Sequence, residues 1–285
     1  MTKLILTILI YQSTSVFIRQ ASSVCSFGAE SWVVLSPIEQ RIKAKIEAVG
    51  TPLKDWDINI NYGIKTGFNE AFIISGEKRK ELIEQDPKSE EIIRPLLRGR
   101  DIKRYGYEFA DLYLITTFPS LKIDIEQYSA VKQHLMSFGY DRLKQTGEQG
   151  SRKKTNNQWF ETQDSISYWE DFYRQKIMYS EIVREPQFYF DKEGKFFPEA
   201  TTFIMTGEHL DYLYQIFHTK TVTYFFKTFY AGGGLGEDGY RYKKKFLENL
   251  PVPKPIDSFD FENIEKTICK LYQLSDEEIA FITNQ

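Results

Sequence analysis

The spacing of apolar residues predicts a series of helices separated by polar segments. The clearest one starts at Ser36, where Ser36 and Glu39 form a capping box and Pro37 takes the first helical position. Apolar residues then recur on one face until Gly50 ends the helix. The same pattern predicts further helices over residues 77–85, 125–144, 210–229, 258–274 and 275–282.

Short runs of branched and aromatic residues predict strands between these helices. They cover residues 4–20, 57–60, 71–74, 105–107, 113–117, 177–180, 187–190 and 201–205. In the first run, Lys3 precedes seven mostly apolar residues, a pattern that a signal peptide also shows. The polar stretch from Gln12 to Ser15 interrupts the run, which favours a buried strand over a secreted leader or a membrane span.

Length and cysteine content indicate a globular protein that needs no covalent support. A chain of 285 residues can form one large or two modest domains with a sizeable core. Its two cysteines, Cys25 and Cys269, lie near opposite ends, and the three histidines do not complete a metal-ligand pattern with them. We therefore expect a reduced, cytoplasmic protein without a bound metal or cofactor and without a membrane partner.

The charge is unevenly distributed. The formal net charge is −3, but residues 257–285 contain seven acids and two bases and contribute −5, which leaves +2 for residues 1–256. A nucleic-acid-binding face would therefore have to come from local clusters of basic residues rather than from bulk charge.

Two stretches combine glycines, amides and basic residues in a way that suits a polar partner. The loop Asn61–Asn69 has two glycines four residues apart, with Lys65, Thr66 and Asn69 as hydrogen-bonding side chains. The stretch Ile92–Tyr105 holds five basic residues against one acid, Asp101, within residues 94–104. Phosphate is the expected counterpart of such a cluster.

Two further basic clusters lie beside aromatic and amide residues, over residues 152–159 and 240–245. Lysines suit phosphates, whereas Arg, Asn and Gln can also pair with base edges. We expect residues 145–158 to form a mobile surface loop. The predicted phosphate contacts are Lys65, Thr66, Arg98, Arg100, Lys103, Arg104, Arg152, Lys153, Lys243, Lys244 and Lys245. The predicted base contacts are Asn69, Asn157, Gln158 and Trp159.

Other chemistry is disfavoured by context. The glycine pattern Gly234–Gly239 matches a dinucleotide loop, but it follows a predicted helix and contains two acids that would repel a pyrophosphate. The patterns Asp101-Ile-Lys103 and Glu193-Gly-Lys195 could belong to a metal-dependent nuclease, but solvated turns explain them equally well.

Several motifs in order resemble the TaqI-like C-terminal specificity domain, the target-recognition part of adenine-specific DNA methyltransferases and type IIG restriction-modification enzymes. The resemblance runs from about residue 31 to residue 255. It is carried by residues 63–74, 93–105, 176–179 and 241–253. It implies an α+β fold in which a mixed, largely antiparallel sheet is flanked by helices, with a short helical tail. The expected organisation is a lead-in strand segment over residues 1–30, a DNA target-recognition domain over 31–255 and an acidic tail over 256–285.

The resemblance implies recognition of double-stranded DNA rather than catalysis. Members of the family carry this domain behind a catalytic domain with an Asn-Pro-Pro-Tyr motif and an S-adenosylmethionine site, and neither sequence occurs in this chain. We therefore expect a methyltransferase or restriction catalytic partner. Two alternatives remain open: a subunit of a split methyltransferase, and a protein-interaction module without DNA specificity.

Overall fold

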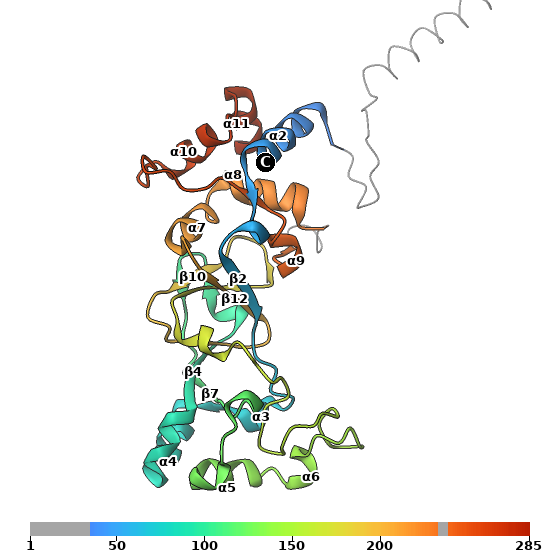
Figure 1. The fold of residues 1–285 in the computed structure, drawn as a ribbon, viewed down its shortest axis with the longest axis vertical. Coiled ribbons are helices and arrows are strands. Elements are labelled where there is room, and N and C mark those ends of the chain that lie inside the picture. The colour runs from blue at the N-terminus through green and yellow to red at the C-terminus, as the bar shows by residue number, and fades with distance from the viewer. Residues whose placement is uncertain (1–34, 233–238) are drawn as a thin grey trace, which may run out of the picture.

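A four-stranded sheet crosses the middle of the molecule and separates two hydrophobic cores (Figure 1). This computed structural model describes residues 35–232 and 239–285, so the predicted strand over residues 4–20 and most of the glycine pattern at 234–239 lie outside the described residues. The strand order is β10-β8-β12-β2, and all neighbours are antiparallel. The strands are β2 (Ile58–Tyr62), β8 (Lys176–Ser180), β10 (Phe188–Asp191) and β12 (Thr202–Gly207).

Alternation along the strands sends side chains into both cores. Tyr179 and Phe203 belong to one core, and their strand neighbours Met178 and Ile204 belong to the other. A sheet that is buried on both faces needs apolar residues at successive positions, and β8 and β12 have them.

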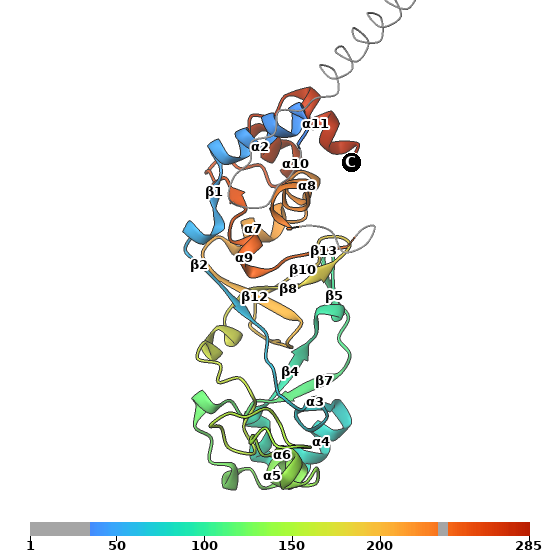
Figure 2. The ribbon, with the colours of Figure 1, turned by 90° about the vertical axis from the view of Figure 1, so that its right-hand side faces the viewer.

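The lower body in Figure 1 is built on a second sheet with the order β11-β4-β7-β3 (Figure 2). Strands β4 and β11 are parallel, and the other neighbours are antiparallel. Its strands are β3 (Ile73–Ser75), β4 (Ile93–Leu97), β7 (Leu112–Ile115) and β11 (Phe197–Pro198). Its helices are α3 (Asn69–Phe72), α4 (Gly76–Gln85), α5 (Ser129–Met136) and α6 (Tyr140–Leu143). The single helix predicted over 125–144 is wrong, because the chain turns at Gly139 with φ +85°.

The upper body is helical and includes the C-terminal tail. Its helices are α2 (Pro37–Val49), α7 (Leu210–Ile216), α8 (Lys220–Phe225), α9 (Lys244–Leu247), α10 (Ile264–Leu271) and α11 (Asp276–Thr283). The capping box predicted at Ser36 is confirmed. The helix predicted over 210–229 is divided at Thr219, whose side chain caps α8, and it ends in a π-helical turn over Phe226–Tyr230.

The tail packs against helices from earlier in the chain. Glu278, which is buried, accepts a hydrogen bond from Lys45 Nζ of α2 at 2.6 Å. Ile268 and Tyr272 lie in the same hydrophobic core as Ile42 and Ile46. The tail and α2 therefore share one core, while the division of the chain at residues 30 and 255 stays a prediction.

Short strand pairs and single helical turns complete the fold. The pairs join β1 (Thr51–Pro52) to β14 (Pro251–Val252), β5 (Ile102–Lys103) to β6 (Gly106–Tyr107), and β9 (Ile182–Val183) to β13 (Tyr240–Arg241). The 3₁₀ turns are Leu53–Asp55, Pro87–Ile92, Gly99–Asp101, Pro119–Leu121, Ile125–Gln127 and Trp169–Tyr173.

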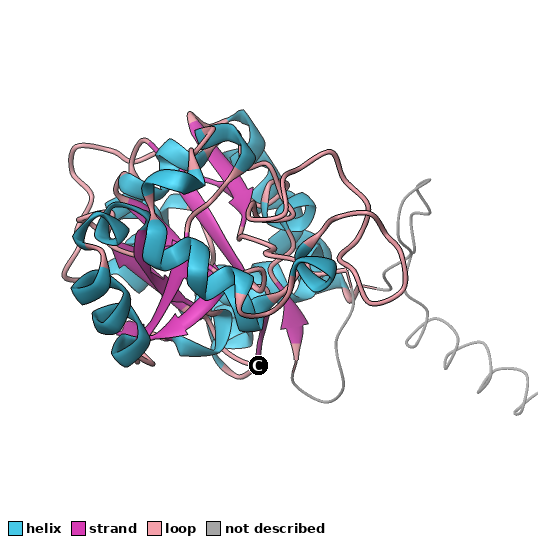
Figure 3. Ribbon diagram, turned by 90° about the horizontal axis from the view of Figure 1, so that it is seen from below, coloured by secondary structure: helices cyan, strands magenta, loops and turns pink. Residues whose placement is uncertain are grey.

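The α+β prediction, with a mixed and largely antiparallel set of strands flanked by helices, is confirmed (Figure 3). Within residues 35–232 and 239–285, no helix is both long and apolar enough to cross a membrane.

Candidate nucleic-acid interface

A groove with a volume of about 1170 Å³ opens where the central sheet meets the lower body. Three of the residues predicted to contact DNA line it, and two further residues with suitable side chains join them. These five residues are Asn69, Arg98, Arg100, Arg184 and Gln187.

Several short elements position these side chains. Asn69 is the first residue of α3. Arg98 and Arg100 lie at the 3₁₀ turn that follows β4, and this turn packs closely against the start of β12, where Gly99 approaches Thr201. Arg184 and Gln187 lie between β9 and β10. The groove therefore collects residues that are more than one hundred positions apart in the sequence.

Arg98 is held within the protein by Asp101. Its Nη2 and Nε donate to the two carboxylate oxygens at 2.7 and 2.8 Å, and its backbone N–H donates to the same group at 3.0 Å. Burial opposes ionisation of Asp101, but these hydrogen bonds outweigh it and hold the pKa of the carboxyl below its usual value. Asp101 is therefore paired with Arg98. This pairing disfavours a role for Asp101 in a metal-dependent nuclease site.

The groove also contains carboxylates. Glu181 lies 3.8 Å from Arg241, and Glu185 lies 3.4 Å from Arg104. Both groups line the groove. A wall that mixes arginine, amide and carboxylate groups offers both donors and acceptors, which suits the edges of base pairs better than a purely cationic wall would.

The basic stretch over residues 94–104 carries less free charge than its sequence suggests. Lys103 pairs with Glu108 at 3.2 Å, and Arg104 Nη2 also donates to the carbonyl of His218 at 3.2 Å. Arg94 lies over the ring of Tyr173. Within that stretch, Arg100 alone has no ion pair, cation–π contact or side-chain hydrogen bond to another described residue.

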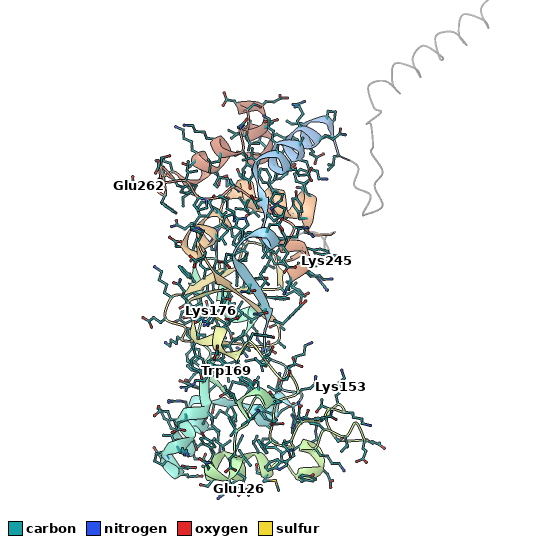
Figure 4. The ribbon with its side chains drawn as sticks, viewed as in Figure 1. Glu126, Lys153, Trp169, Lys176, Lys245 and Glu262 are labelled. Atoms are coloured by element: carbon teal, nitrogen blue, oxygen red, sulfur yellow. The ribbon has the colours of Figure 1, made fainter. Side chains whose placement is uncertain are left out.

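The lysines at α9 are exposed to different degrees. Lys243 lies over the ring of Phe246 at 5.5 Å, and Lys244 lies 3.7 Å from Glu248. Lys245 is exposed and has no ion pair among the residues that the structure describes. Figure 4 shows Lys245 and Lys153 on the same long side of the molecule, with Glu262 on the opposite side.

Two of the predicted phosphate contacts, Thr66 and Arg152, are buried and hydrogen-bonded within the protein. Thr66 is buried, and its hydroxyl donates to Asn69 Oδ1 at 2.6 Å and accepts from the Phe68 N–H. Arg152 is 2% exposed and donates to four main-chain carbonyls. Lys65 and Lys153, beside them in sequence, are exposed and remain predicted phosphate contacts.

The other three predicted base contacts lie in the loop between α6 and β8. Asn157 donates both amide hydrogens to the carbonyls of Thr162 and Gln163, so its amide holds the loop together. Trp159 is half-buried against Phe160. Gln158 is exposed. Among these three, Gln158 is the residue whose side chain is accessible to a base.

Sequence reasoning missed Arg184 and Gln187. Neither lies in a basic cluster, since Arg184 is followed by Glu185 and Pro186. Their place in the groove depends on the pairing of β9 with β13 and of β10 with β8, which brings this connection to the groove. No group of three or more His, Cys, Asp or Glu residues in the described part of the chain is placed to hold a metal ion.

The fold is shared with known restriction-modification enzymes. The type IIL restriction-modification enzyme MmeI, solved in complex with DNA, matches with a TM-score of 0.52 and 12% identity over 82% of this chain and 36% of that enzyme. The type IIG restriction endonuclease BpuSI matches with a TM-score of 0.50 and 17% identity over 83% and 28%. The chain thus spans about a third of the length of these enzymes. At such identities the likeness shows the fold alone.

The sequence defines the family more narrowly. The model of the TaqI-like C-terminal specificity domain matches residues 94–252, which is more than half of the 285 residues. The chain belongs to this family of specificity domains. No curated protein matches its sequence.

Proposed function

We propose that this chain binds duplex DNA in a sequence-specific manner, as the specificity portion of a restriction-modification system. The observation that carries the proposal is the groove, where Asn69, Arg100, Arg184 and Gln187 converge from separate elements. Membership of the specificity-domain family and the fold shared with two restriction enzymes support it.

The proposed division of roles follows from which side chains are free. Arg100 and Arg184 are exposed and have no ion pair among the described residues, so their guanidinium groups can reach a guanine edge or a phosphate. The Thr66 hydroxyl donates to the side-chain carbonyl oxygen of Asn69 and so orients the Asn69 amide. The amide nitrogen of Asn69 has no partner within residues 35–232 and 239–285. An oriented amide of this kind suits adenine.

Catalysis is assigned to a partner. In this proposal the chain selects the DNA site, and a methyltransferase or restriction catalytic domain in another chain modifies or cuts it. A split methyltransferase is the finer version of the same proposal, since it too requires a separate catalytic chain.

Selection from a pool of random duplexes tests the proposal. The wild-type chain should enrich one short motif, because each good bidentate contact discriminates by roughly 1–3 kcal/mol. Asn69→Ala and Arg184→Ala should each relax the preference at one or two positions of that motif. Lys270→Ala, which removes an exposed cation on α10, serves as the matched control and should enrich the wild-type motif. Failure of the wild-type chain to enrich any motif would contradict autonomous sequence recognition.

A further inference from the structure

Residues 144–165 form an irregular segment, here called the arm, that links α6 to the elements before β8. It contains no helix or strand, and it presents Lys153 and Lys154 to solvent. Neither lysine has an ion pair with a described residue. Because regular secondary structure does not fix the arm, its shape depends on irregular main-chain hydrogen bonds and on side-chain hydrogen bonds.

Arg152 provides four side-chain hydrogen bonds from inside the arm. Its Nε donates to the Leu143 carbonyl at 2.7 Å, and its Nη2 donates to the Trp159 carbonyl at 2.6 Å. Its Nη1 donates to the carbonyls of Glu161 at 2.8 Å and Thr66 at 3.0 Å. The four acceptors come from before the arm, from its second half and from the separate Asn61–Asn69 loop.

The guanidinium group also packs over the ring of Phe72, with 5.0 Å between the guanidinium carbon and the ring centroid. Burial lowers the pKa of Arg152 to about 10, so the group still carries its charge at neutral pH. In the described part of the chain no carboxylate pairs with it, and main-chain carbonyl dipoles compensate the charge instead. Only the planar fork of an arginine can satisfy acceptors in so many directions.

Other bonds complete the same unit. Gln145 Nε2 donates to the carbonyls of Gln158 and Glu161 at 3.1 and 3.0 Å. The backbone N–H groups of Gln163 and Asp164 donate to the carbonyls of Thr66 and Lys65 at 3.1 and 3.2 Å. The arm and the Asn61–Asn69 loop are therefore joined into one hydrogen-bonded structure.

We propose that Arg152 is a positioning residue that holds Lys65, Lys153 and Lys154 as a preformed surface for the phosphates of DNA, separate from the base-contacting groove. This inference rests on the proposed DNA-binding function. A preformed surface avoids the entropy cost of ordering two lysine-bearing segments when DNA binds. The predicted role of Arg152 thereby changes from direct phosphate contact to the support of its neighbours.

Two measurements test the proposal on Arg152→Lys, which keeps the charge but cannot reach four carbonyls. The first is hydrogen exchange of the arm amides, with the α2 amides as an internal reference. The second is the salt dependence of binding to a random duplex. Loss of three phosphate contacts would reduce the slope of log K against log salt by up to about 2.7. Ile268→Val, a conservative change in the core of the upper body, controls for general loss of stability.

The expected result is faster exchange across the arm and a smaller salt slope in Arg152→Lys, with both quantities unchanged in Ile268→Val. Unchanged arm exchange in Arg152→Lys would overturn the positioning role whether or not the chain binds DNA. Faster exchange with an unchanged slope would overturn the link between Arg152 and the phosphates. If arm exchange is faster in Arg152→Lys but the wild-type chain binds no DNA, the proposed function is wrong. The proposed phosphate-binding role of the arm is then wrong as well, while the structural role of Arg152 stands.

Discussion

The salt dependence of DNA binding follows from which basic side chains are free in the structure. In the segments assigned to the interface, six exposed cations have no ion pair with another described residue: Lys65, Arg100, Lys153, Lys154, Arg184 and Lys245. Four of the predicted phosphate contacts are paired with carboxylates: Arg98, Lys103, Arg104 and Lys244. The two sets predict different slopes for the logarithm of the DNA-binding constant, log K, against the logarithm of the salt concentration.

Each phosphate contact with B-DNA contributes about −0.9 to the slope of log K against log salt. If the free set alone contacts phosphates, the slope is about −5, and affinity falls on the order of 10³-fold between 50 and 200 mM salt. If the paired cations also exchange their carboxylates for phosphates, the slope approaches −9 and the loss is on the order of 10⁵-fold. Exposed ion pairs such as Lys103–Glu108 and Arg104–Glu185 contribute only about 0–1 kcal/mol each, so for these pairs the exchange is energetically accessible and has to be measured.

Fluorescence anisotropy of a labelled duplex across several salt concentrations gives the slope directly. We expect a value near −5, and we expect the double variant Lys153→Ala/Lys154→Ala to reduce its magnitude by about 2. The control Lys270→Ala should leave the slope unchanged. A slope near −9 would refute the separation of free and paired cations, and a slope weaker than about −2 would refute phosphate contact by most of the free set.

Three further predictions concern specificity, stability and pH. Arg184→Lys should weaken binding to a selected duplex by about 1–3 kcal/mol while leaving a random duplex nearly unaffected, because a lysine cannot pair bidentately; equal loss on both duplexes would contradict base contact. Asp191→Asn should lower the free energy of unfolding by about 3–5 kcal/mol in urea titrations, because Lys176 would lose its 2.7 Å carboxylate partner inside the protein; a loss below 1 kcal/mol would argue against a buried ion pair. Burial holds the pKa of His218 below its ordinary value of 6.5, so the unfolded chain takes up protons first as pH falls through 6.5. The melting temperature should therefore be lower at pH 5.5 than at pH 7.5, and His218→Gln should reduce the difference.

Local signals in the sequence predicted the elements that depend on them. The capping box at Ser36 and the strands predicted over residues 177–180 and 201–205 are confirmed. The two long helices were predicted wrongly because a single residue ends the helix although the apolar periodicity continues. Gly139 adopts a positive φ, and Thr219 caps a new helix. Both residues are visible in the sequence, but periodicity alone does not reveal them as breaks.

The candidate site was predictable only in part, because burial decides which charges are free. Asn69 and Arg100 were expected and do line the groove. Arg152 looked like a surface base, yet one of its acceptors, the Thr66 carbonyl, lies 86 positions away in sequence. Arg184 carried no local signal. Long-range strand pairing determines the position of Arg184, and long-range hydrogen bonds determine that of Arg152. A single sequence does not contain this information in local form.

The central claim is that DNA occupies the groove, and site-directed crosslinking tests it most directly. Gln187→Cys places a thiol in the groove, and Lys270→Cys places one on α10 of the upper body. Each variant is made with Cys25→Ser, so that the remaining native thiol is the buried Cys269, and is then labelled with a thiol-reactive photoactivatable crosslinker and irradiated with a selected duplex. The account predicts a protein–DNA crosslink from position 187 and none from position 270. Crosslinking from position 270 alone would contradict it and would move the DNA to the other end of the molecule.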